Sequence, residues 1–306
     1  MTFESNAAYD DITMKVDGSV VHPTGREVKA LPRMLQGLFG GDLELVTPCR
    51  ASHPAVFASF VVSREGIFNL KDNLGGGPIS QGNRADAFLL ALLRAIADAI
   101  LIGPGTLKAE PNHKWHLAHI FDTYPQMHGL EAVQKELEEY REKLGGKSMY
   151  PPTIVMTSSG NIDPSAAIFS DPDIKTYVVS GREGAARAAK LLGSTTTTGV
   201  IRCGNEKLDL EEMLRTLKRE LGVNLLYYQG GRKAFEGLVK KNLVSQLFLS
   251  QMQMSPRGNL DPENVQYLFS AGDRTYPEEA KVLSRRMDGT HRLTLWNLDF
   301  RSVRSL

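Results

Sequence analysis

Short apolar runs alternate with amphipathic segments along most of this chain. The run at 55–62 (AVFASFVV) is apolar throughout and rich in strand-forming residues, which predicts a buried strand. The segment 83–97 has apolar residues at i, i+3 and i+4 spacing, which predicts an amphipathic helix with Ser80 as its N-cap. A second buried strand is predicted at 99–102, where AILI ends in a Gly-Pro-Gly turn.

The alternation resumes after a polar stretch at 107–150. Within that stretch, 130–144 carries charges that can pair at i, i+4, and this pattern predicts a helix. Helices are also predicted at 184–192, at 210–221 after an Asp209 cap, and at 232–241. Strands are predicted at 153–157, 176–179, 199–203, 224–228, 246–249 and 292–300, the last as a candidate edge strand. This order is typical of a mostly parallel sheet with crossover helices.

The first 50 residues fit this pattern poorly. They carry scattered Pro and Gly with weak periodicity, and short helical turns are predicted only at 31–38. We interpret 1–50 as an extension packed on the core. Residues 51–306 are expected to form one α/β domain, with a helical insertion at about 107–150.

Composition and charge narrow the function classes. The 306 residues are 42% hydrophobic and 23% charged, as in ordinary globular proteins. A formal charge of +1 lacks the basic excess with which nucleic-acid-binding proteins displace counterions, so no nucleic-acid partner is expected. The most apolar long stretch, 87–102, is interrupted by Arg94 and Asp98 and is too short to cross a bilayer. Because the N-terminus also lacks a signal-peptide pattern, we expect a cytoplasmic protein with no membrane partner.

The cysteines and clustered histidines give no metal or disulfide signature. Cys49 and Cys203 are too few for a disulfide framework and are interpreted as buried thiols. His116 and His119 form an i, i+3 pair that could bind a metal on a helix, but no third ligand is evident near them or His113. We interpret this histidine segment as a polar loop over the active site and expect no metal.

Several predicted strands run directly into Gly-rich or Ser-rich turns. Two of them, GPGT at 103–106 and QGGR at 229–232, lead into plausible helix starts. In open α/β sheets, ligands bind beyond the carboxyl ends of the strands, where helix amides can hold phosphates and glycine permits close approach. Neither turn fits the GxGxxG or Walker A spacing, so the common nucleotide motifs are excluded. For either turn alone, a simple tight turn is the alternative.

The order of these turns carries a family resemblance. The chain reads SREG at 63–66, GPIS at 77–80, ADAILIGPGTLKAE at 97–110 and QGGRKAF at 229–235, with NLVSQL at 242–247 and SPRG at 255–258. These motifs resemble the reductase half of bifunctional riboflavin-biosynthesis deaminase–reductases, which has the dihydrofolate reductase fold. The resemblance covers about residue 55 to the C-terminus, and the block at 97–110 is its most specific part.

The resemblance implies a three-layer fold, with a mixed, mostly parallel central sheet between helices, in an NADPH-dependent homodimer. The substrate implied is a small pyrimidine-like or pteridine-like molecule such as 5-amino-6-(5-phosphoribosylamino)uracil. Cofactor contacts are implied for Gly103, Gly105, Thr106, Thr157, Ser158, Ser159, Gln229, Gly230, Gly231 and Arg232, with Arg182 as a candidate cation for the 2′-phosphate. Substrate contacts are implied for Ser63, Glu65, Ser80, Arg84, Asp86, Lys108 and Glu110. No catalytic triad is expected, because hydride transfer from a cofactor needs positioning above all.

Three departures from the family's motifs concern acidic residues. Its S-L-D-G reads SREG here, which we take as an acidic residue absent or displaced by one position. Its E-G-G reads QGG at 229–231, and its V-D-E-L reads VSQL at 244–247. These losses leave an alternative, a repurposed nucleotide-binding relative without the riboflavin-pathway activity. A structural or interaction protein with no small ligand is a third reading. The zinc signature of the deaminase half is absent.

Overall fold

The computed structural model describes residues 52–72, 75–144, 147–193 and 197–268, and the course of two strands at 280–288 and 291–298. The extension predicted at 1–50, its helical turns at 31–38 and Cys49 lie outside the described residues. Within them, the predicted elements can be compared with the structure one by one.

A nine-stranded sheet runs through the described part of the chain, in the order β10-β11-β8-β1-β7-β3-β4-β5-β6. Along this order from β8 to β6, adjacent strands are parallel to one another, whereas β11 is antiparallel to both β8 and β10. The expected mixed, mostly parallel sheet is therefore confirmed, but β11 is not an edge strand. The bounds are β1 Ala55–Val62, β3 Ala99–Ile102, β4 Thr153–Met156, β5 Thr176–Ser180, β6 Thr198–Arg202, β7 Leu225–Tyr228, β8 Gln246–Met252, β10 Ala280–Asp288 and β11 His291–Leu298.

Two short strands that the sequence pattern did not predict form a separate antiparallel pair. They are β2 (Ile67–Leu70) and β9 (Val265–Tyr267). Leu70 and Ile67 of this pair pack with Ile79 in a small apolar cluster of their own. This pair flanks the turn that follows β1.

The long helix after this pair has nearly the predicted span, but its N-cap is a different residue from the one predicted. Helix α3 (Arg84–Ile96) is capped by Asn83, whose side chain accepts a hydrogen bond from the Asp86 amide at 2.9 Å. Ser80 ends the short helix α2 (Gly77–Ser80) instead, so its assignment as the N-cap is wrong. The reason is backbone geometry, because Gln81 and Gly82 both adopt positive φ and bring the chain into an extended conformation only at Asn83.

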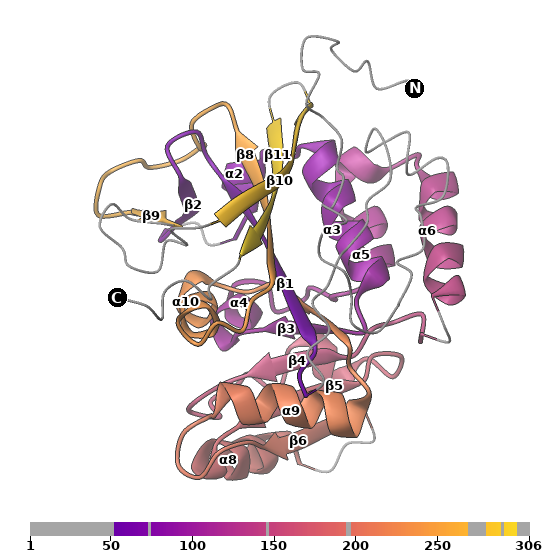
Figure 1. Cartoon of the computed structure of the whole chain (residues 1–306), viewed down its shortest axis with the longest axis vertical. Coiled ribbons are helices and arrows are strands. Elements are labelled where there is room, and N and C mark those ends of the chain that lie inside the picture. The colour runs from indigo at the N-terminus through magenta and orange to yellow at the C-terminus, as the bar shows by residue number, and fades with distance from the viewer. Residues whose placement is uncertain are drawn as a thin grey trace.

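Helices cover both faces of the sheet, and the buried residues divide into two main clusters (Figure 1). One face is covered by α3, α5 (Leu117–Thr123), α6 (Glu131–Lys143), α7 (Ala167–Ser170) and α8 (Arg182–Leu192). The opposite face is covered by α9 (Leu210–Leu221), which Asp209 caps as predicted, and by α10 (Arg232–Lys240). The short helices α4 (Pro104–Ala109) and η1 (Pro125–Met127) complete the described set.

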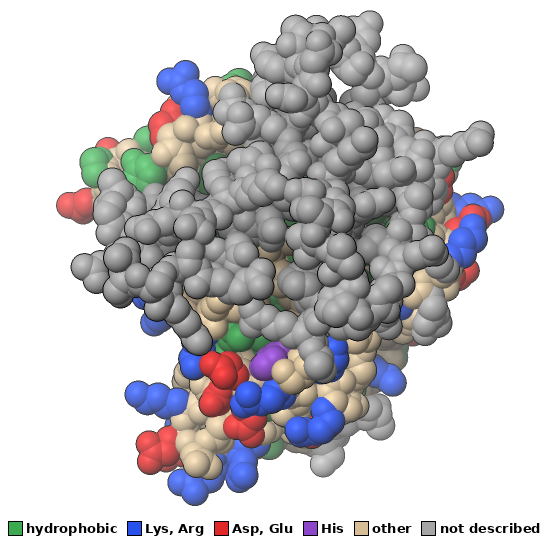
Figure 2. All heavy atoms as spheres, viewed as in Figure 1, with side chains coloured by type: hydrophobic (Ala, Val, Ile, Leu, Met, Phe, Trp, Pro, Cys, Tyr) green, Lys and Arg blue, Asp and Glu red, His purple; other side chains and the backbone are tan. Residues whose placement is uncertain are grey.

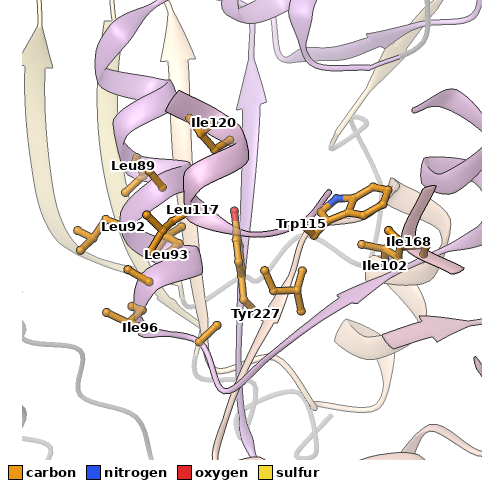
Figure 3. Packing of buried hydrophobic residues seen from close by; sticks show 14 of the residues in the cluster. Leu89, Leu92, Leu93, Ile96, Ile102, Trp115, Leu117, Ile120, Ile168 and Tyr227 are labelled. Carbon is orange, nitrogen blue, oxygen red and sulfur yellow. The ribbon is translucent and has the colours of Figure 1, made fainter. Parts of the chain in front are cut away.

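The segment predicted as a polar insertion contributes to the core. Trp115 is buried, and Figure 3 shows it in the same cluster as Ile102 of β3 and Ile168 of α7. Leu117 and Ile120 of α5 face the apolar side of α3. The interpretation of 113–119 as a polar loop is therefore wrong. Its apolar residues are too few to predict burial on their own, and they are buried because α3 supplies a matching surface.

Helix α6 is held to the C-terminal end of α3 by one arginine. Arg141 is buried, and its guanidinium donates to the main-chain oxygens of Arg94, Ala95 and Ala97 at 3.2, 2.8 and 2.7 Å. It donates also to Ser148 O at 2.6 Å. The last carbonyls of a helix have no partner within the helix. Arg141 therefore satisfies groups that would otherwise be buried without hydrogen bonds.

Candidate functional site

The sheet changes its winding direction between β3 and β7, which are neighbouring parallel strands. The chain that leaves β3 runs to the face covered by α3, whereas the chain that leaves β7 enters α10 on the opposite face. Such a switch point separates the loops beyond the strand ends and is where open α/β sheets bind ligands. The two Gly-rich turns singled out in the sequence, 103–106 and 229–232, both lie at this position.

Three glycines of these turns border space that no described atom fills. A Cβ added at Gly103, Gly105 or Gly231 would meet nothing within 4 Å. Gly230 differs, because a Cβ there would lie 2.5 Å from the Tyr228 hydroxyl. Gly103, Gly105 and Gly231 therefore permit the close approach of a ligand to the backbone, whereas Gly230 is required for packing.

The turn at 229–232 opens a helix whose first amides have no side-chain cap. Gly231 is the N-cap of α10 and supplies no side-chain acceptor. Arg232 is ion-paired with Glu236 and donates to Tyr267 O at 2.8 Å, so its side chain is tied back along the helix. Lys233 is exposed in the first turn. Free amides and a cation at a helix start favour an anion, and this terminus adjoins the open space beside Gly231.

The Ser-rich turn after β4 lies two strands away on the same edge of the sheet. Ser158 and Ser159 are exposed, whereas Thr157 is buried and its hydroxyl accepts from the Gly160 amide at 3.1 Å. The cation beside this turn is Arg187 of α8, which donates to Ser159 O at 2.6 Å. Sequence reasoning proposed the exposed Arg182 at the start of α8 instead. A helix places both residues near the turn, and only the structure distinguishes them.

Close backbone packing fixes that turn against α8. A Cβ at Gly160 would lie 1.8 Å from Gly184 O, and one at Gly184 would lie 2.0 Å from Ser180 Oγ. Only glycines permit this contact, so the position of the exposed serines relative to α8 is set by main chain against main chain.

The SREG turn after β1 keeps a carboxylate. Ser63 is fully buried and donates to Glu65 Oε2 at 2.7 Å, while Glu65 Oε1 accepts from Ser255 Oγ at 2.9 Å. These hydrogen bonds, the one from Ser63 first, hold the pKa of Glu65 below its usual value. In the sequence SREG this acid stands at the third position, where the family's S-L-D-G has its aspartate. The expectation that this turn lost or displaced its carboxylate is wrong.

The remaining predicted substrate residues are distributed around α3 and α4. Ser80 is half-buried at the end of α2, and the Arg84 Nε donates to Gln126 O of η1 at 2.8 Å. Lys108 and Thr106 lie on α4, where Lys108 is exposed and Thr106 half-buried. Thr106 is a predicted cofactor contact, whereas Ser80, Arg84 and Lys108 are predicted substrate contacts, and all four assignments stay predictions.

Asp86 lies on the sheet-facing side of the first turn of α3. It is 6% exposed, and burial raises the pKa of its carboxyl to about 6, while the Ser250 hydroxyl on β8 partly opposes the shift. Ser250 pairs in register with Val61, two residues before Ser63. Asp86 is therefore a buried acid close to the carboxyl ends of β1 and β8. Its pKa lies in the range where a carboxyl group can both release and take up a proton near neutral pH.

A fully buried arginine connects the turn at 229–232 with the segment 113–116 that follows α4. Arg94 of α3 is 0% exposed, and its Nε donates to Gln229 Oε1 at 3.0 Å. Its Nη2 contacts His113 Nε2 at 2.8 Å, and Nη1 donates to the main-chain oxygens of His116 and Lys114. His113 Nδ1 lies 3.4 Å from Glu110 Oε2. Gln229 and Glu110, predicted from separate motifs, are thus brought into one network.

Sequence reasoning missed Arg94 and His113 as part of the site. A signal was present, because Arg94 interrupts an otherwise apolar helix face, and a charged residue there needs buried partners. Burial first, and then the Arg94 charge, hold the pKa of His113 well below its usual value, and the same two causes lower the pKa of His116 to about 4. Burial raises the pKa of Glu110, and Arg94 opposes that shift.

The histidine cluster is not arranged as a metal site. The ring centroid of His113 lies 4.4 Å from that of His119, and that of His116 lies 5.9 Å from that of His119. Over the described ranges, no group of three His, Cys, Asp or Glu residues could hold a metal ion. His113 Nε2 is occupied by Arg94, so a ligand atom that a metal would need is already used.

The face of the molecule drawn in Figure 2 carries side chains of both charges. On the face drawn in Figure 2, Lys and Arg side chains lie beside Asp and Glu side chains over the described part. None of the helices that the structure describes is long and apolar enough to span a membrane. The carboxyl edge of the sheet therefore remains the feature of the described structure that best fits a ligand.

Comparison with known proteins identifies the family of the chain and its fold. The family model for the RibD C-terminal domain matches residues 54–252. Among solved structures, a pyrimidine reductase-like protein from Corynebacterium diphtheriae is 18% identical with a TM-score of 0.59, over 81% of this chain and 93% of the other. A riboflavin biosynthesis reductase from Saccharomyces cerevisiae is 14% identical with a TM-score of 0.52, over 82% and 92%. A search of curated protein sequences found no match.

The likeness extends to one half of a bifunctional protein. The diaminohydroxyphosphoribosylaminopyrimidine deaminase/5-amino-6-(5-phosphoribosylamino)uracil reductase from Thermotoga maritima is 15% identical with a TM-score of 0.55, over 81% of this chain. The chain covers only 58% of that relative's length. At such identities the likeness shows the fold alone, and it confirms the dihydrofolate-reductase-like fold expected from the sequence.

Proposed function

Because the chain belongs to the RibD C-terminal domain family, we propose that it is an NADPH-dependent reductase of a small pyrimidine-like or pteridine-like molecule. The observation that carries this proposal is the open space beside Gly103, Gly105 and Gly231 at the switch point of the sheet. A dinucleotide needs such a place, where its pyrophosphate can lie against backbone amides without a Cβ in the way.

The residues at this edge fit a phosphorylated dinucleotide. The uncapped start of α10 would hold the pyrophosphate, with Gly103, Gly105 and Thr106 on the opposite side. The exposed hydroxyls of Ser158 and Ser159, with Arg187 beside them, would hold a 2′-phosphate, since hydroxyls and a guanidinium are the donors that a phosphate dianion needs. When bound, the cofactor supplies the hydride, and the protein supplies binding and orientation.

The substrate side of the site would be formed by Asp86, Glu110 and Gln229. A carbon that accepts hydride leaves electron density on the neighbouring nitrogen or oxygen, which must gain a proton. Asp86 is suited to hold and deliver that proton, because the pKa of its carboxyl is about 6. The name of the Thermotoga relative gives 5-amino-6-(5-phosphoribosylamino)uracil as the molecule that it reduces, and we take this molecule as the first to test.

The alternative is a repurposed relative that binds the nucleotide without this reaction. It is favoured by Gln229, where the family has a glutamate, and by Ser245 and Gln246, where it has two acidic residues. The carboxylate of Glu65 weakens that alternative, because one of the three motifs presumed to have lost acidic residues has kept its carboxylate.

A titration of thermal stability with NADPH, and with NADH in parallel, tests the cofactor. A nucleotide concentration of about 100 times its Kd should raise the free energy of unfolding by about 2.7 kcal/mol. Gly231→Val should abolish this gain with little change to the ligand-free protein, since the added side chain enters open space. Gly237→Ala, within the same helix, is the control and should keep the gain. If neither NADPH nor NADH stabilises the protein, the proposed reductase function is wrong.

The choice of NADPH over NADH is expected to depend on Arg187. Arg187→Glu should weaken NADPH binding at least about tenfold, or about 1.4 kcal/mol, by placing a carboxylate where the 2′-phosphate would lie. NADH binding should change less than about twofold by the same reasoning. Lys190→Glu, also exposed on α8, controls for general charge. Equal weakening of both nucleotides, measured by calorimetry, would place the 2′-phosphate elsewhere.

A further inference from the structure

Arg94 carries a charge that no carboxylate neutralises at close range. It is 0% exposed, and within the described ranges no Asp or Glu oxygen lies at ion-pair distance from it. Charged side chains are almost never fully buried unless paired. Its described partners are instead two side chains, Gln229 and His113, and two main-chain oxygens. The arginine therefore organises neutral groups.

An arginine can only donate, and this decides how Gln229 is oriented. Because Arg94 Nε lies 3.0 Å from Gln229 Oε1, the carbonyl end of that amide faces the arginine. The amide nitrogen points away, and it makes no hydrogen bond within the described part of the chain. Gln229 is half-buried at the end of β7, beside the open space at Gly231. Its two N–H groups are therefore left to donate at the carboxyl edge.

The same reasoning fixes the proton of His113. Its Nε2 lies 2.8 Å from Arg94 Nη2, so Nε2 must accept, and the ring proton must sit on Nδ1. Nδ1 lies 3.4 Å from Glu110 Oε2, so that proton faces a carboxylate. The other titratable groups around the ring are His119, His116 and Tyr124, and none brings a negative charge at neutral pH. Glu110 is thereby held as an acceptor.

We propose that Arg94 is a positioning residue that sets the hydrogen-bonding polarity of the site, leaving Gln229 as a donor and, through the Nδ1–H of His113, Glu110 as an acceptor. The inference rests on the proposed function only in placing Gln229 and Glu110 against a substrate. It follows that the substrate atom facing Gln229 is an acceptor, such as a carbonyl oxygen or an unprotonated ring nitrogen. The atom facing Glu110 is a donor. A glutamate at 229 would present acceptors to the substrate at position 229 as well as at Glu110.

Nitrogen NMR of the full chain with ¹⁵N-labelled histidine tests the polarity without any ligand. The His113 signals, assigned by their loss in His113→Gln, should report a neutral ring with the proton on Nδ1 from pH 5 to 8. A proton on Nε2, or an imidazolium at pH 7, would overturn the proposal outright. This result does not depend on whether the chain binds NADPH.

Kinetics with 5-amino-6-(5-phosphoribosylamino)uracil and NADPH test the consequence for the reaction. Arg94→Lys keeps the charge but loses the planar fork. It should populate both His113 tautomers and lower kcat/KM at least tenfold, with the Kd for NADPH changed less than threefold. Unchanged tautomer and unchanged kcat/KM in the folded variant would overturn the proposal.

A second variant keeps the proposal testable if Arg94→Lys fails to fold. Gln229→Met removes the donor but leaves Arg94 in place, so kcat/KM should fall at least tenfold while the His113 tautomer persists. If Gln229→Met turns over substrate as well as the wild type does, Gln229 is not a donor to substrate and the inference is wrong. No turnover by the wild type, with the His113 proton on Nδ1, would refute the proposed reaction and leave the assigned polarity standing.

Discussion

Arg141→Met is expected to lower the free energy of unfolding by about 3 kcal/mol, a large share of the stability of a typical domain. Methionine fills a similar volume but leaves the main-chain oxygens of Arg94, Ala95 and Ala97 without their donor. An unpaired buried carbonyl costs about 1–3 kcal/mol. Part of the total cost of the three carbonyls is offset because the variant no longer buries a charged guanidinium. Burial lowers the pKa of Arg141 to about 10, so the group remains charged at neutral pH.

Urea denaturation followed by circular dichroism would measure this loss. Lys135→Met, on the same helix but exposed, is the matched control and should change stability by less than about 0.5 kcal/mol. A loss below about 1 kcal/mol for Arg141→Met would mean that water replaces the guanidinium at the end of α3.

Asp86→Asn is expected to stabilise the protein while impairing the reaction. The pKa of this carboxyl is about 6 in the folded protein against an ordinary value of 3.8, a difference of about 2 units or about 3 kcal/mol. Between these pH values the folded protein binds more protons than the unfolded chain, so its stability falls as the pH rises through this window. Asparagine carries no charge to desolvate and is free of this penalty. The increase in the free energy of unfolding of Asp86→Asn over the wild type should therefore be near zero at pH 4 and approach about 3 kcal/mol at pH 8.

The same substitution should lower kcat by about a hundredfold, because asparagine cannot deliver a proton. Asp122→Asn, exposed on α5, provides the control for both measurements and should alter neither stability nor kcat appreciably. Denaturation at pH 4 and pH 8 measures the change in stability, and steady-state kinetics measures the change in kcat. Equal stability of Asp86→Asn and wild type at pH 8 would show that ionising the Asp86 carboxyl does not lower the free energy of unfolding.

The strands of this fold were predictable because their ends are marked locally. Apolar runs such as 55–62 and 99–102 stop at glycine-rich turns, and the strand bounds at both places agree with the structure. The pair β2 and β9 was missed because three or four residues are too few to show a period. The cap of α3 was misplaced because two positive φ angles before Asn83 cannot be read from Gln81 and Gly82 alone.

The candidate site was predictable in its turns and not in its connections. The turns at 103–106 and 229–232 could be placed at one sheet edge because parallel strands share a direction. That Arg94 joins Gln229 to His113 depends on how deeply α3 is packed, which no local pattern reports. Burial at 113–119 was missed for the same reason, since a tertiary surface decides it.

One main-chain carbonyl couples the two buried arginines. Arg141 donates to the backbone oxygen of Arg94, whose own side chain orders Gln229 and His113. An excursion that detaches α6 would release the end of α3 while the central strands stay paired, as local openings do. On warming, the protein would then lose catalytic competence before its sheet melts. Amide exchange along 131–143 would report the temperature at which this begins better than the overall melting curve.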